Sequence, residues 1–297
     1  MGTDAYADAA GLVARSAAAY VSSVPTDPAD EGFFGPASVT WRLSADLSSI
    51  VAGLRALLVQ ALHPLAMAGV DQHSDWRRDP VGRLAATSSY LATVSFGDRA
   101  AAGRAAARVR RIHEHVNGTD PVTGRPYAAS DPALLLWVHA TLVESTMVAC
   151  ELFGTPLAPA DGDRYVAEMT VAAELVGIPA ALVPSDLAGL RQYLSSVLPE
   201  LRGTPAAADA AAFLLDPPGL DPDIAEIWQD IRNGATAAMP EWALQMYGYH
   251  TPGALTAARR AEIRQALGVL DVVFLGEPGV LEARQRIALR MRAAQRA

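Results

Sequence analysis

Lysine is absent from this chain of 297 residues, and all 24 of its basic residues are arginines. A lysine Schiff base, a lysine general base and the lysine of a phosphate-binding P-loop are therefore excluded. The chain has a single cysteine, Cys150, so neither an intrachain disulfide nor a metal site built on paired cysteines can form.

Several short signatures of metal and nucleotide sites are also missing. The sequence contains no GxGxxG, GxxxxGK, HExxH or GxSxG motif. A carboxylate-bridged di-iron centre needs Glu-x-x-His pairs, and none occurs. The close pair His113 and His115 is two residues apart, which places the two rings on different faces of a helix. We therefore expect neither a zinc nor a di-iron centre.

Charge is sparse and mostly negative. Charged residues make up 19% of the chain, apolar residues 51%, and the net charge is −8. This composition excludes a disordered chain and argues against nucleic-acid binding.

The start of the chain carries Asp4 and Asp8 without a basic signal segment, and the longest apolar runs, near 56–70 and 132–143, are shorter than the ~20 residues of a membrane span. We expect a soluble, cytoplasmic protein with no membrane span.

The remaining pattern is rich in Ala, Leu and Arg at helical spacing, and runs of alternating β-branched residues are missing. It predicts an all-α fold with a single multi-helix domain. We expect an N-terminal helix and loop over 1–31, the main domain over 32–275, and a C-terminal helix over 276–297 that packs on it. The predicted helices are 4–23, 44–70 (kinked at His63-Pro64), 80–95, 98–117, 131–153, 161–177, 185–198, 204–215, 221–237, 255–275 and 278–296, with a loop or short hairpin over 119–129.

The six histidines are the natural candidates for chemistry. His113 follows a helical face of small and apolar residues at positions 102, 105, 106 and 109, against which a flat macrocycle can lie while an imidazole holds its metal. His115 shares a face with Arg111 and is expected in solvent. His139 lies in a strongly apolar helix, where its ring must find a partner. It could be a metal ligand, a group that orients one, or a hydrogen-bonded core histidine. His63, before Pro64, is expected to mark a kink that lines a cavity.

Arg83 and Thr87 are four residues apart and share one helix face. An arginine beside a hydroxyl in an apolar protein suggests an anion partner such as a propionate, or polar donors above a ligand. The alternative is an arginine that reaches solvent from the first turn of the helix. Four carboxylates are further acid or base candidates, although nothing in their spacing selects one of them: Asp71, Asp75, Glu144 and Glu151.

Four segments in order resemble one family. They are LLVQALHPLAMAGVDQHSDW (57–76), DPVGRLAATSSYLATVSFG (79–97), RVRRIHEHVNG (108–118) and YAASDPALLLWVHATLVES (127–145). Together they resemble the family of MpaB-type oxygenases and rubber oxygenases, and the resemblance extends over about 33–275. It implies a helical fold that encloses one haem b.

The resemblance further implies roles for single residues. The arginine-rich stretch that ends in His113 matches the helix of the proximal iron ligand, and Arg83 and Thr87 match an Arg-x-x-x-Thr pair beside the haem. A lysine that can ligate the iron from the distal side in a rubber oxygenase of this family is replaced here by Ala86, so we expect a distal site that is open or is filled by water or another side chain. His139 is a further catalytic candidate.

The implied activity is that of a haem-dependent oxygenase that uses O2 to oxidise a hydrophobic small molecule. One form of the reaction is oxidative cleavage of a carbon–carbon double bond, as in an isoprenoid, and the other is a different oxidation of an aromatic or peptide-derived small molecule. Two alternatives stay open. One is a haem-binding protein without turnover, such as a sensor or store. The other is a helical scaffold without a cofactor.

Overall fold

A computed structural model describes residues 18, 21–22, 32–74, 76–78, 80–218, 220, 222–250, 255–275 and 279–296, and all structural statements below concern these residues. The predicted helix 4–23 lies outside them apart from Ala18, Val21 and Ser22. The fold is all-α in a single domain, as predicted, with one two-stranded antiparallel sheet as its sole sheet in the described residues.

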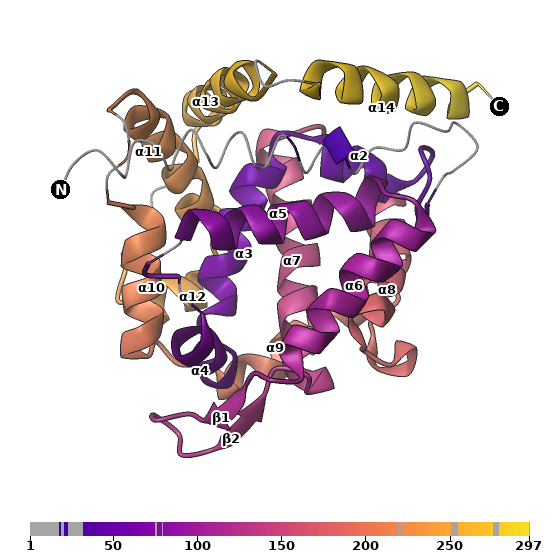
Figure 1. Cartoon of the computed structure of the whole chain (residues 1–297). Coiled ribbons are helices and arrows are strands. Elements are labelled where there is room, and N and C mark those ends of the chain that lie inside the picture. Colours follow the sequence, from indigo (N-terminus) through magenta and orange to yellow (C-terminus); the bar gives the residue numbers. More distant parts are fainter. Residues whose placement is uncertain are drawn as a thin grey trace.

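The elements follow one another along the chain as short and long helices (Figure 1). They are α2 (Val39–Ala45), α3 (Ser49–Gln60), α4 (Pro64–His73), α5 (Pro80–Phe96), α6 (Arg99–His113), β1 (Asn117–Thr119), β2 (Pro126–Ala128), α7 (Pro132–Phe153), α8 (Asp161–Val176), α9 (Leu187–Val197), α10 (Pro205–Leu215), α11 (Pro222–Ala237), α12 (Glu241–Met246), α13 (Ala257–Leu275) and α14 (Val280–Ala294).

The centre of the molecule is the pair α3 and α7, which pack along each other (Figure 1). Helix α7 begins with Asp131 as N-cap, whose carboxylate accepts a hydrogen bond from the Ala133 amide, and Pro132 takes the first helical position. It ends before Gly154, as predicted. A Cβ at Gly154 would lie 2.4 Å from Asp46 Oδ1, so the chain leaves α7 through a place that only glycine fits.

Helix α7 also passes the length and hydropathy test for a membrane-crossing helix. Two thirds of its most apolar window, 67%, are buried inside the protein, as expected for a central core helix. The bent pair α2 and α3 passes the same test if it is counted as one segment. The predicted absence of a membrane span is therefore not confirmed by length and composition. The burial of α7 is that of a core helix.

The predicted helix over 44–70 is wrong in part. The segment forms α2, α3 and α4, with breaks at Asp46–Ser48 and at Ala61–His63. The second break is the predicted one, because Pro64 cannot continue a helix from α3 but is well suited to the first position of α4. The first break turns the chain by 93° between α2 and α3.

Helix α6 is shorter than the predicted 98–117. It starts at the N-cap Asp98 and ends at His113. Asn117 and Gly118 do not cap the helix, since both belong to strand β1, which pairs with β2 in the register Asn117↔Ala128. The predicted loop or hairpin over 119–129 is therefore a hairpin.

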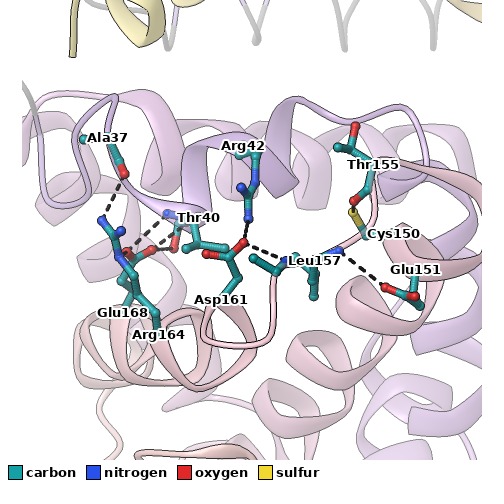
Figure 2. Close-up of polar contacts among 12 residues, drawn as sticks. Ala37, Thr40, Arg42, Cys150, Glu151, Thr155, Leu157, Asp161, Arg164 and Glu168 are labelled. Carbon is teal, nitrogen blue, oxygen red and sulfur yellow. Dashed lines mark hydrogen bonds and ion pairs between the residues drawn. The ribbon is translucent and has the colours of Figure 1, made fainter. Parts of the chain in front are cut away.

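A polar network joins α2 to α8 (Figure 2). Glu168 of α8 accepts hydrogen bonds from the Thr40 amide and hydroxyl, both at 2.8 Å, and from the Val39 amide at 3.2 Å. Arg164, one turn earlier on α8, donates to Glu168 at 3.0 Å and to the Ala37 carbonyl at 3.0 Å. Glu168 thus satisfies amides that the first turn of α2 leaves without intrahelical partners.

We expect Glu168→Ala to lower the free energy of unfolding by about 1–2 kcal/mol, because the first turn of α2 would lose its carboxylate acceptor. Urea unfolding followed by circular dichroism measures the change. Glu174→Ala, an exposed position on the same helix, is the matched control. Equal stabilities of the two variants would show that the network contributes nothing.

The last helix packs on the same core. Ala283 and Ile287 of α14 are buried with Trp41 of α2 and Phe96 of α5. The rings of Trp41 and Phe96 meet edge to face, with centroids 5.4 Å apart. Helix α14 thereby covers one end of the bundle (Figure 1).

Candidate active site

Five of the six histidines belong to elements that meet at one end of the molecule. In Figure 1 this end holds α4, the carboxyl end of α6, the hairpin β1–β2 and the start of α7. Helix α4 contacts both strands of the hairpin, and β2 leads directly into α7. The histidines are His63, His73, His113, His115 and His139.

A small apolar cluster fixes this end. Leu65 and Ala68 of α4 are buried against Tyr127 of β2 and Leu134 of α7, with Val116 at the edge. The Tyr127 hydroxyl donates to Gln72 Oε1 at 2.8 Å. The hairpin approaches so closely that a Cβ at Gly118 would lie 2.7 Å from the Tyr127 hydroxyl oxygen. The end of α6 and the start of α7 are therefore held in a defined relation to α4.

Two exposed histidines are oriented by backbone carbonyls. His73 Nε2 lies 3.0 Å from the Asn117 carbonyl oxygen, and His115 Nδ1 lies 2.8 Å from the Arg111 carbonyl oxygen. Since a carbonyl oxygen only accepts, each of these nitrogens carries the proton and donates it. The His73 ring also meets the Tyr127 ring edge to face, with centroids 6.2 Å apart.

A surface pocket of about 460 Å³ lies between α4 and α6. Its lining consists of His73, Arg108, Arg111, Ile112, His115 and Val116. His115 is thus exposed, as predicted from the face that it shares with Arg111, and it borders this pocket. His113 is not part of the lining, because the helix turns its side chain to another face.

His113 is the last residue of α6 and is half-buried, and its Nδ1 atom is buried. Ala102 and Ala106, which precede it on the same face, are fully buried. The predicted face of small residues therefore points into the bundle. Helix α6 packs there against α5 and α8.

His139 lies in the second turn of α7 and is half-buried. Its surroundings are so poorly solvated that burial lowers the pKa of the ring from 6.5 to about 4. His139 is consequently neutral at pH 7, and one of its nitrogens keeps a lone pair. This state fits a ligand or a hydrogen-bond acceptor.

His63 is the histidine nearest to the core. It is 5% exposed, it is the N-cap residue of α4, and its ring lies against Trp137 with centroids 6.0 Å apart. Burial lowers its pKa, and the carboxylate of Glu200 opposes that shift. The His63 Nδ1 atom is buried and has no hydrogen-bond partner among the described residues. An imidazole in this state is available to a ligand or an ordered water.

Because the pKa of His139 is lowered in the folded protein, we expect the free energy of unfolding to depend on pH. Between pH 6.5 and pH 4 the unfolded chain takes up a proton that the folded chain refuses, so acidification favours unfolding in this window. The stabilisation is complete above pH 6.5 and is lost as the pH falls toward 4. We expect the loss between pH 7 and pH 4 to be roughly 3 kcal/mol.

Urea unfolding at pH 7, 5.5 and 4 measures this loss in the wild type and in His139→Gln. The wild type is expected to lose more stability on acidification than His139→Gln does. His250→Gln, at an exposed position, serves as control. Parallel pH profiles for the wild type and His139→Gln would contradict the buried, neutral state of His139.

Arg83 and Thr87 both lie on α5, as predicted. The Thr87 side chain is exposed, and the Arg83 side chain lies outside the described part of the structure. Their predicted pairing beside a ligand therefore stays a prediction. Ala86, at the position of the family's distal lysine, is exposed as well.

The carboxylate candidates take different places. Asp71 forms an ion pair with Arg77 at 2.6 Å, and Glu151 accepts from the Leu157 amide at 3.4 Å in Figure 2. Asp75 lies outside the described residues. Glu144 forms a bidentate ion pair with Arg55, so its two oxygens are committed to a guanidinium. None of these carboxylates is placed as the acid or base of a reaction.

Arg55, the partner of Glu144, was not predicted from the sequence. Arg55 is 2% exposed, and its guanidinium also donates to the Ala238 carbonyl at 2.8 Å and to the Ser145 hydroxyl at 2.6 Å. The signal in the sequence is that Arg55 is the one charged residue within the apolar helix 49–60. Glu144 also borders a smaller pocket of about 100 Å³ on the opposite face of α7 from His139.

The comparisons with known proteins identify a family for this chain. The family model described as "ER-bound oxygenase mpaB/B'/Rubber oxygenase, catalytic domain" matches residues 41–272. No curated protein and no solved structure matches the chain. The match contains α3 to α12 in full and with them every histidine of the site. The chain therefore belongs to the family of MpaB-type oxygenases and rubber oxygenases.

Proposed function

We propose that this chain is a haem b-dependent oxygenase that acts on a hydrophobic small molecule with O2. The observation that carries the proposal is the match of residues 41–272 to the catalytic domain of an oxygenase family. Oxidative cleavage of a carbon–carbon double bond is the reaction that we infer from the rubber oxygenases in this family.

The residues at the histidine-rich end fit a haem. His63 has a buried Nδ1 atom without a partner among the described residues, and His139 is neutral at pH 7. Metal-binding imidazoles must be neutral, and burial secures this state for both rings.

In this proposal His113 holds the iron through a ring nitrogen from the end of α6. A bound haem supplies O2 binding and activation, with the polarity of the distal pocket deciding between them. Arg83 pairs with a propionate, and Thr87 donates a hydrogen bond from the same helix face. His139 accepts or relays a proton as a neutral base. The apolar side chains of α3 and α7 exclude water from the substrate.

Oxygen uptake with a short polyisoprenoid as substrate tests the activity. We expect the haem-loaded protein to consume O2 and to form carbonyl products that react with dinitrophenylhydrazine. The matched control is the same protein without substrate. Failure to consume O2 with any unsaturated hydrophobic substrate, in a protein that has bound haem, would favour a sensor or store over an oxygenase.

A further inference from the structure

The pocket between α4 and α6 carries two arginines in its lining. Arg108 and Arg111 lie on one face of α6 and both line the pocket. Neither arginine has an ion-pair partner among the described residues. In a chain with a net charge of −8, two arginines without a carboxylate partner in one pocket form a local site for an anion.

The pocket is apolar between its arginines. Ile112 is 54% exposed although it is a large aliphatic residue, and Val116 lines the same wall. The rings of His73 and His115 form further walls, and the hydrogen bonds to Asn117 and Arg111 direct one N–H of each ring at the backbone. A pocket of about 460 Å³ with cationic and apolar walls suits a ligand that carries both an anion and a hydrocarbon part.

Basic residues in the last turn of a helix have another role, since they stabilise its carbonyl end. Arg110 has a different structural role, because its guanidinium donates to the Leu175 carbonyl in the last turn of the neighbouring helix α8. Arg108 and Arg111 lie on the other side of α6 and make no such contact with the described backbone. Their common orientation toward one pocket is not explained by the helix dipole.

We propose that this pocket binds the carboxylate of an amphipathic ligand, held by Arg108 and Arg111, while Ile112 and Val116 contact its hydrocarbon part. Arginine matches a carboxylate with two parallel hydrogen bonds, which favours this group over a hydroxyl or an amide. The carboxylate comes either from a fatty-acid-like substrate or from a haem propionate. The oxidation of such a ligand rests on the proposed function. Its binding does not, and binding is measured by itself.

The test measures binding of dansyl-labelled undecanoic acid to the full-length protein by fluorescence, and haem content by the pyridine haemochrome assay. The variant is Arg108→Gln combined with Arg111→Gln. Arg104→Gln, an exposed arginine on the same helix outside the pocket, is the matched control. Dansyl-labelled undecanol, which lacks the carboxylate, shows how much of the affinity is apolar. Circular dichroism verifies that all variants fold.

We expect the double variant to bind the labelled acid about ten- to hundred-fold more weakly than the wild type. Its affinity for the labelled alcohol, and the affinity of Arg104→Gln for the labelled acid, are expected to equal those of the wild type. A loss of probe affinity at unchanged haem content identifies a substrate carboxylate. A loss of haem content at unchanged probe affinity identifies the propionates. If the double variant keeps both the probe affinity and the haem content within about two-fold of the wild type, the proposal is overturned.

The outcome also separates this inference from the proposed function. If the chain takes up no haem when haem is supplied, but binds the labelled acid through Arg108 and Arg111, the carboxylate site is supported and the proposed haem oxygenase is contradicted.

Discussion

Replacing His113 by alanine is expected to abolish the Soret band of the haem-loaded protein or to shift it strongly. In the proposed function His113 would hold the haem iron, and an alanine would leave the iron without that side-chain donor. The position at the carboxyl end of α6, where the ring is half-buried, makes the substitution tolerable for folding. We therefore expect the far-ultraviolet circular dichroism of the variant to match that of the wild type.

Two controls sharpen this experiment. His250→Ala removes an exposed imidazole outside the site and is expected to leave the spectrum intact. His113→Gly with imidazole added to the solution is expected to regain the band, because a free imidazole can enter the space of the missing ring. A band that survives His113→Ala unchanged would assign the ligand to another histidine, with His139 and His63 as the neutral, buried candidates.

The largest effect on stability is expected at the ion pair of Arg55 and Glu144. Glu144→Leu removes the carboxylate and leaves the guanidinium of Arg55, 2% exposed, with Ser145 and the Ala238 carbonyl as its partners. A buried charge that loses its counter-ion costs about 3–5 kcal/mol. Because the Glu144 side chain is 28% exposed, water replaces part of the lost interaction and we expect about 3 kcal/mol.

Denaturant unfolding measures this effect. Glu262→Leu, which breaks the exposed ion pair with Arg259, is the control and is expected to change stability by less than about 1 kcal/mol. The double variant Arg55→Met with Glu144→Leu is expected to regain most of the stability, because it removes both charges together. A Glu144→Leu protein that is as stable as the Glu262→Leu protein would refute the structural role of the pair. It would also return Glu144 to the candidates for an acid or base.

The sequence predicted helices best where caps are encoded locally. Helix α7 is bounded by Asp131-Pro132 and Gly154, and its predicted and observed ranges agree to one residue. The segment 44–70 was predicted as one helix because apolar residues at helical spacing dominate it, and the polar residues Ser44, Asp46 and Ser48 at the first turn were not used as a turn signal. Helix α12, of six residues, was not predicted, because so short an element carries too little pattern.

The site was predictable only in part, for a physical reason. Residue type and helical phase pointed to His113 and His139, and the structure places both on the expected helices. The pocket beside Arg108 and Arg111 depends on the approach of α4 to the end of α6, which the hairpin sets through Tyr127 and Gly118. Contacts between segments so distant in sequence leave no periodic signal. The same holds for Arg55 and Glu144, which are 89 residues apart.

The proposed haem oxygenase is tested by the absorption spectrum of the purified wild-type protein with haem supplied. The spectrum is recorded in the ferric state and after reduction with dithionite. We expect a protein-bound Soret band that shifts on reduction and changes again when O2 is admitted. A spectrum identical to that of free haem in the same buffer would contradict it.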